Sequence, residues 1–169
     1  MKVQEIAPNV EPGPLLAGAQ FVDAYRVAVE GHALDARTAA EKMFARLPRW
    51  IAALLRLRNL VVAPFGLKTS GHGEPASGGM IGIFPVVSET PERLVAGFND
   101  HHLDFRVVVD VAALADGQEV TTTTLVKTHN WLGRTYLMVI MPFHRLISRT
   151  MLRQLTNRRA RTLMPRSKR

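Results

Sequence analysis

The 169-residue chain contains no cysteine, and this absence excludes several kinds of chemistry. Without thiols the protein forms no disulfide, has no thiolate nucleophile and offers no cysteine ligand to a metal ion. No apolar run approaches the ~18 residues of a membrane-spanning helix, and the N-terminus lacks the apolar core of a signal peptide. With 47% hydrophobic residues, the composition predicts a soluble cytoplasmic protein with one substantial core.

Acidic residues are missing from the last third of the chain. Residues 120–169 hold eleven of the 22 Lys and Arg and none of the 14 Asp and Glu. Six of these basic residues form a tail: Arg158, Arg159, Arg161, Arg166, Lys168 and Arg169. Such a tail could dock on acidic partners, nucleic acid or an anionic membrane, although a solvated tail is the commoner explanation.

Two strands and a long helix dominate the C-terminal half. Apolar and polar residues alternate over Leu103–Val111, and a second strand over 120–129 follows a turn predicted at Asp116-Gly117. This turn predicts that Asp104 faces His129 and that Arg106 faces Lys127. Phe105, Val107, Val109 and Val111 then share one face with Thr122, Thr124, Val126 and Thr128.

The helix is predicted over 131–156, with Asn130 as its N-cap. Its predicted apolar stripe comprises Leu132, Tyr136, Val139, Ile140, Phe143, Ile147 and Met151. Pro142 lies inside the pattern, where it predicts either a kink or two helices end to end.

The rest of the chain predicts an antiparallel sheet with two helices inserted after its first strand. An irregular lead-in is expected over 1–18, followed by a strand over Phe21–Val29. A helix is then expected from Asp35 or Thr38, and a second helix from Pro48. A glycine-rich loop over 66–82 has no phosphate-binding motif, and strands are expected over Ile81–Val87 and Leu94–Phe98. The predicted domain spans 19–156, followed by the basic tail over 157–169.

Four stretches carry a family resemblance: MFARLPRW at Met43–Trp50, IGIFPVVSETP at Ile81–Pro91, HLDFRVVV at His102–Val109 and TLVKTHNWLGRTYL at Thr124–Leu137. They resemble the bacterial family catalogued as domain of unknown function 2867, which is grouped with the helix-grip (Bet v 1/START-like, SRPBCC) superfamily. The resemblance implies an α+β fold with a curved antiparallel sheet of five or six strands packed on a long C-terminal helix around a ligand pocket. It also implies an oxidoreductase partner by analogy, but it transfers no catalytic residue and no cofactor.

Three hypotheses follow for function. The leading one is a module that binds a small, largely apolar ligand, which could carry an anionic group, through Phe105, Arg106, Thr122, Thr124, His129, Arg134, Tyr136 and Phe143. The second is an enzyme in which Asp104 and His129 perform acid-base chemistry on that ligand. Against it stands a simpler interpretation, a solvated polar face with His129 satisfied locally. The third is an adaptor that docks through the basic tail.

Metal binding and nucleophilic catalysis have less support. His101, His102, Asp104 and His129 are close enough to suggest metal ligands, but adjacent histidines in extended chain point to opposite faces, so we assign no metal site. His144 is interpreted as a packed or capping residue. Ser148 has no base at a meaningful sequence spacing.

Overall fold

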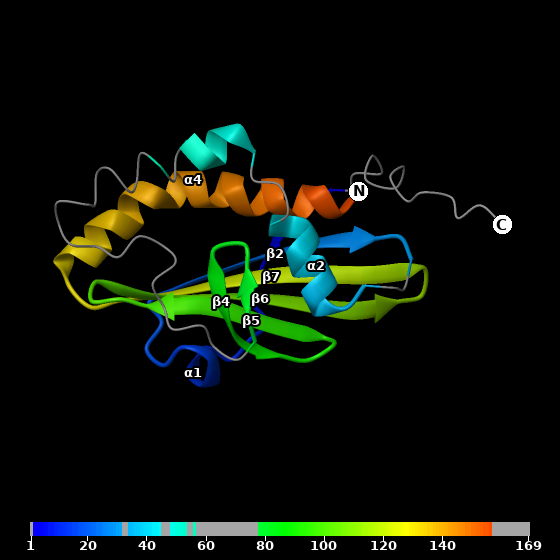
Figure 1. The fold of residues 1–169 in the computed structure, drawn as a ribbon, viewed down its shortest axis with the longest axis horizontal. Helices are drawn as coiled ribbons and strands as arrows, with labels where there is room; N and C mark the ends of the chain where they lie inside the picture. Colours follow the sequence, from blue (N-terminus) through cyan, green and yellow to red (C-terminus); the bar gives the residue numbers. More distant parts are fainter. Residues whose placement is uncertain (1, 32–33, 45–47, 54–55, 57–77, 157–169) are drawn as a thin grey trace.

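The computed structural model describes residues 2–31, 34–44, 48–53, 56 and 78–156. Its strands form one seven-stranded antiparallel sheet in the order β1-β2-β7-β6-β5-β4-β3. The long helix α4 and the shorter α2 cover one face, and the single turn of α1 lies against the other (Figure 1). The elements are β1 (Gln4–Ile6), α1 (Pro12–Leu15), β2 (Phe21–Val29), α2 (Ala36–Phe44), β3 (Met80–Ile81), β4 (Phe84–Glu89), β5 (Arg93–Asn99), β6 (Leu103–Leu114), β7 (Gly117–Thr128) and α4 (Trp131–Thr156).

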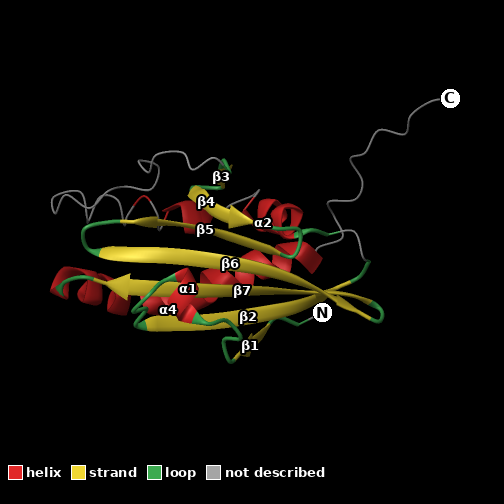
Figure 2. Ribbon diagram, turned by 90° about the horizontal axis from the view of Figure 1, so that it is seen from below, coloured by secondary structure: helices red, strands yellow, loops and turns green. Residues whose placement is uncertain are grey.

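The sheet divides the interior into two cores of unequal size. The larger lies between the sheet and the helices α2 and α4, and includes Tyr25, Val109 and Leu152. The smaller lies under α1 on the opposite face, where Val108 and Leu125 pack against Leu16. Figure 2 shows α1 and α4 on opposite sides of the sheet. Strands buried on both faces explain why Val107, Val108 and Val109 form an unbroken apolar run.

The sheet is larger than the five or six strands predicted. The expected strand over 81–87 is two strands, because the chain turns at Gly82, whose φ is +60°. The lead-in also supplies an edge strand, β1, which pairs with β2 through Gln4 and Arg26. The two predicted helices therefore follow the second strand and not the first. Helix α2 begins after Asp35, whose Oδ1 accepts a hydrogen bond from the Thr38 amide at 2.6 Å. Residues 49–53 are also helical.

The predicted register of the β6–β7 hairpin is wrong by two residues. Leu114 pairs with Gly117, so the turn is Ala115-Asp116, Asp104 faces Lys127, and Arg106 faces Leu125. Gly117 belongs to β7 and not to the turn, because it lies so close to β2 that a Cβ there would be 2.3 Å from the Val29 carbonyl oxygen. A shift of two residues leaves the faces unchanged because side chains alternate with period two.

Helix α4 has the predicted bounds, and Asn130 caps it by accepting a hydrogen bond from the Gly133 amide at 3.0 Å. It continues through Pro142 as one helix, which excludes two separate helices, and it bends along its length (Figure 1). Its predicted inner stripe is wrong in part: Val139 is 65% exposed and Phe143 42% exposed.

Candidate functional site: a cavity under the long helix

The sheet face under α4 is built from alternate residues of its central strands. On β7, Thr122 and Thr124 point the same way as Val126, and they face Val109 and Val107 across the pair with β6. Tyr25 on β2 is opposite Thr122 on the other side. The hydroxyl-bearing side chains of Thr122 and Thr124 therefore lie in the middle of an otherwise apolar sheet surface.

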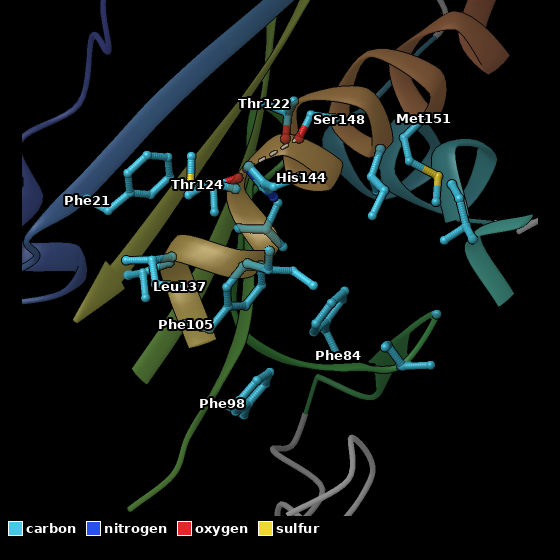
Figure 3. Close-up of a pocket in the computed structure, with 18 of the residues that line it drawn as sticks. Phe21, Phe84, Phe98, Phe105, Thr122, Thr124, Leu137, His144, Ser148 and Met151 are labelled. Atoms are coloured by element: carbon cyan, nitrogen blue, oxygen red, sulfur yellow. Dashed lines mark hydrogen bonds between the residues drawn. The ribbon is translucent and has the colours of Figure 1, made fainter. Parts of the chain in front are cut away.

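Between this surface and the helices lies a cavity of about 200 Å³. Its walls come from β2, β4, β5, β6 and β7, from α2 and from α4, so residues far apart in the sequence meet around it (Figure 3). From α4 the lining residues are Tyr136, Leu137, Ile140, Met141, His144, Ile147, Ser148 and Met151. No Lys, Arg, Asp or Glu is among the described residues that line it.

One end of the cavity is aromatic. The ring of Phe84 stacks on that of Phe105, with centroids 5.1 Å apart, and on that of Phe98 at 6.2 Å. Phe44 of α2 meets Phe84 edge-on at 5.8 Å. Gly82 makes this approach possible, because a Cβ there would lie 3.1 Å from the Phe44 Cβ. Offset and edge-on rings at these separations attract one another, so they form a continuous wall.

Polar groups gather away from this wall, around His144. Its Nε2 lies 3.2 Å from Asp23 Oδ1 and 3.4 Å from Ser148 Oγ. Figure 3 shows His144 and Ser148 close to Thr122 and Thr124, with Phe84 and Phe98 at the opposite end. Asp23 is not among the described lining residues, and both partners are largely buried: the exposed fractions are 11% for the Asp23 side chain and 18% for that of His144.

These three residues do not form a nucleophilic relay. In a Ser-His-Asp relay the carboxylate holds one ring nitrogen and the hydroxyl contacts the other. Here Asp23 and Ser148 both approach the same nitrogen of His144. The Asp23–His144 pair therefore fixes the ring in place, while Ser148 is left as a hydroxyl at the cavity wall.

Tyr25 lies beside this pair and is only 1% exposed. Burial, together with the nearby carboxylates of Asp23 and Glu5, raises the pKa of Tyr25 to about 12, since each disfavours a phenolate. The Tyr25 hydroxyl and Asp23 Oδ2 are both buried without a well-aligned hydrogen bond within the described structure. The guanidinium of Arg149 covers the Tyr25 ring at 5.7 Å from its centroid.

Half of the ligand-binding residues predicted from the sequence line the cavity. Phe105, Thr122, Thr124 and Tyr136 do so. The others lie elsewhere: His129, Arg106, Arg134 and Phe143 are not among the lining residues.

Asp104 and His129 do meet, as the sequence suggested. His129 Nε2 lies 3.0 Å from Asp104 Oδ1, although the register places Lys127, not His129, opposite Asp104. Neither residue lines the cavity, and Asp104 lies on the sheet face opposite Phe105. This pair is separate from the space in which a ligand would bind.

Arg106 has a structural role on that same opposite face. Its guanidinium donates to the carbonyl oxygens of Phe98 and Phe105 at 3.0 and 2.8 Å, and to Asn99 Oδ1 at 2.7 Å. Burial lowers its pKa, with the Asp104 carboxylate acting in the opposite direction. Gly97 leaves room for the Arg106 side chain, because a Cβ at residue 97 would lie 3.0 Å from Arg106 Cδ and 2.1 Å from the Phe105 carbonyl oxygen.

The polar end of the cavity was missed because its parts are far apart in the sequence. Asp23 and His144 are separated by 121 residues. The available signal was Asp23 itself, a charged residue on the same strand face as Phe21, Tyr25 and Val27. A carboxylate on a buried face needs a partner, and His144 on the long helix is that partner.

Some predictions concern residues or properties outside this site. The basic tail over 157–169 lies outside the described residues. Within the described ranges, no three His, Asp or Glu side chains gather as a metal-binding group. In that same part of the chain, no helix combines the length and apolar character needed to cross a bilayer.

Comparison with known proteins gives one family and distant similarities to solved structures. The model of the family described as "Protein of unknown function (DUF2867)" matches residues 15–151. A search of curated proteins found no match. Among solved structures, the chain is similar to a protein from Rhodobacter sphaeroides, with 15% identity, 91% of this chain and 95% of that chain covered, and a TM-score of 0.42. It is also similar to CalU16 from Micromonospora echinospora, with 14% identity, coverage of 79% and 80%, and a TM-score of 0.31.

Proposed function

Because the chain belongs to the DUF2867 family of proteins of unknown function, whose description names no activity, we propose a function from the cavity: the protein binds a small, largely apolar molecule between α4 and the sheet. In this proposal the architecture is of the helix-grip type, with α4 as the helix that closes the cavity. The observation that supports it is a space of about 200 Å³ with aromatic and aliphatic walls and a few polar groups at one end. Ligand sites have this composition, in which apolar walls supply affinity and few polar groups set orientation.

The size of the cavity indicates a ligand with about one ring. An engineered apolar cavity of about 150 Å³ binds benzene. A bound apolar molecule of that size would contact the aromatic and aliphatic walls and remove their surface from water.

The enzyme hypothesis based on Asp104 and His129 has less support. It required both side chains to reach the ligand, and neither lines the cavity. The adaptor hypothesis and the oxidoreductase partner stay predictions.

A pair of neighbouring substitutions tests the cavity without knowledge of the ligand. Val107 lines the cavity, whereas Val108 points to the opposite core and packs with Leu16 and Leu125. Val107→Phe should place its ring in free space and leave the unfolding free energy nearly unchanged. Val108→Phe should destabilise by about 1–3 kcal/mol because it overpacks a filled core.

Native mass spectrometry on protein purified from cells then tests binding. We expect a small-molecule adduct that is lost on denaturation and is weaker in Val107→Phe. If Val107→Phe destabilises the protein as much as Val108→Phe does, the space is filled and the proposal is wrong.

A further inference from the structure

The polar end of the cavity restricts the kind of ligand. No Lys or Arg is among the described lining residues, and the imidazole of His144 is already paired with the Asp23 carboxylate. A ligand carboxylate would therefore add a second negative charge close to Asp23, and the described lining residues offer it no unpaired cation. Burying a charge without a partner is strongly unfavourable.

The hydroxyl groups at the same end are suited to a neutral partner. Thr122, Thr124 and Ser148 line the cavity, and hydroxyls can both donate and accept hydrogen bonds. Ser148 already contacts His144, which leaves the two threonine hydroxyls on β7 as the groups at this end that a ligand can use. A ligand hydroxyl could accept a hydrogen bond from one threonine and donate one to the other.

The other end selects for a ring. Phe84, Phe98 and Phe105 present stacked rings there, at 5.1–6.2 Å between centroids. A flat ligand could extend this stack, while its polar substituent reaches the threonines. A volume of about 200 Å³ has room for one ring with a short substituent.

We infer that the cavity is a site for a small uncharged aromatic or alicyclic alcohol, with its ring against Phe84 and Phe105 and its hydroxyl bound by Thr122 and Thr124. This inference rests on the proposed function and adds the ligand class to it. Asp23 acts as a positioning residue, because it holds His144 and repels ligand anions without touching the ligand.

Three probes of similar shape test the inference on the full chain: 4-ethylphenol, 4-ethylbenzoate and ethylbenzene. Binding is measured by isothermal titration calorimetry and by protein NMR shifts at neutral pH, where the phenol is uncharged and the benzoate is an anion. We expect 4-ethylphenol to bind about tenfold more tightly than either of the other two, as two neutral hydrogen bonds would give.

Threonine variants locate the hydroxyl site. Thr122→Val combined with Thr124→Val should abolish the preference for 4-ethylphenol and leave ethylbenzene binding intact. The matched control is Thr123→Val, because Thr123 lies between them on the opposite sheet face; its preference should equal that of the unmodified protein. Asp23→Asn should raise the affinity for 4-ethylbenzoate relative to 4-ethylphenol, a change in selectivity that a purely structural role of Asp23 would not produce.

The possible results separate the two claims. If none of the three probes binds, the proposed function is overturned for ligands of this size, and the alcohol site with it. If 4-ethylbenzoate or ethylbenzene binds as tightly as 4-ethylphenol, the cavity is a binding site but the inferred ligand class is wrong. A preference for the phenol that survives in the double valine variant would also overturn the assignment to Thr122 and Thr124.

Discussion

The buried tyrosine under α4 gives a quantitative test of the structure. Tyr25 is 1% exposed, and burial beside the Asp23 carboxylate raises its pKa to about 12 from an ordinary value of 10. In the unfolded chain Tyr25 loses its proton near pH 10, whereas in the folded protein it keeps the proton up to about pH 12. The unfolded state therefore binds fewer protons in this interval, and stability must fall as the pH rises.

The size of the effect follows from the two pKa values. At pH 11.5 the pKa difference of Tyr25 between the folded and unfolded states lowers the unfolding free energy by about 2 kcal/mol, whereas at pH 9 this contribution is close to zero. We expect the unfolding free energy of the unmodified protein to fall by about 2 kcal/mol more than that of Tyr25→Phe over this range. Lysines and the second tyrosine contribute equally to both proteins, so they cancel in the comparison.

The assay is urea unfolding at a series of pH values from 9 to 11.5, followed by tryptophan fluorescence and circular dichroism. A spectrophotometric titration of the folded protein, with Tyr25→Phe subtracted, should show one phenol that ionises near pH 12. If both proteins lose stability in parallel, or if the Tyr25 phenol ionises near pH 10 in the folded protein, the described burial of Tyr25 beside Asp23 is wrong.

Three further substitutions test the elements around the cavity by urea unfolding. Asn130→Ala should destabilise the protein by about 0.5–2 kcal/mol because it removes the cap of α4. Asn130→Asp should retain most of the stability, and equal unfolding free energies for the two variants would contradict the cap. Leu152→Ala, at a fully buried position, should cost about 2–5 kcal/mol, and its control Leu146→Ala, at a half-exposed position on the same helix, well under 1 kcal/mol. Gly97→Ala should cost more than 1 kcal/mol because its Cβ would lie 2.1 Å from the Phe105 carbonyl oxygen, which the paired strand cannot move away; unchanged stability would show that β5 and β6 are not paired as described.

Local patterns in the sequence determined most of the elements. The strand over Phe21–Val29 and the helix over 131–156 have the predicted bounds, and Asn130 caps the helix as predicted. Each of these depends on neighbours in sequence: alternation within a strand, a polar cap followed by apolar residues, and spacing of three and four along a helix. The sheet faces of β6 and β7 were likewise correct, because a face depends only on the parity of the residue number.

The register of the β6–β7 hairpin could not be predicted without the tertiary structure. The sequence indicated Asp116-Gly117 as the turn centre, but Gly117 begins β7, where a Cβ would lie 2.3 Å from the Val29 carbonyl oxygen of the neighbouring strand. The glycine is therefore required by a close approach between β7 and β2, which is invisible in the local pattern. Similarly, Gly82 permits a turn against Phe44, and this contact divides one predicted strand into two.

The tertiary structure also decided which side of α4 faces the sheet. Apolar residues occupy so much of the circumference of the helix that several stripes fit the sequence. The pairing of His144 with Asp23 and the packing of Met151 and Leu152 fix a rotation that leaves Val139 and Phe143 outside. The sequence by itself thus determined the elements and their faces, through interactions between near neighbours. The cavity and its polar end were decided only where β2, β7 and α4 meet, because contacts across 121 residues leave no periodic signal in the chain.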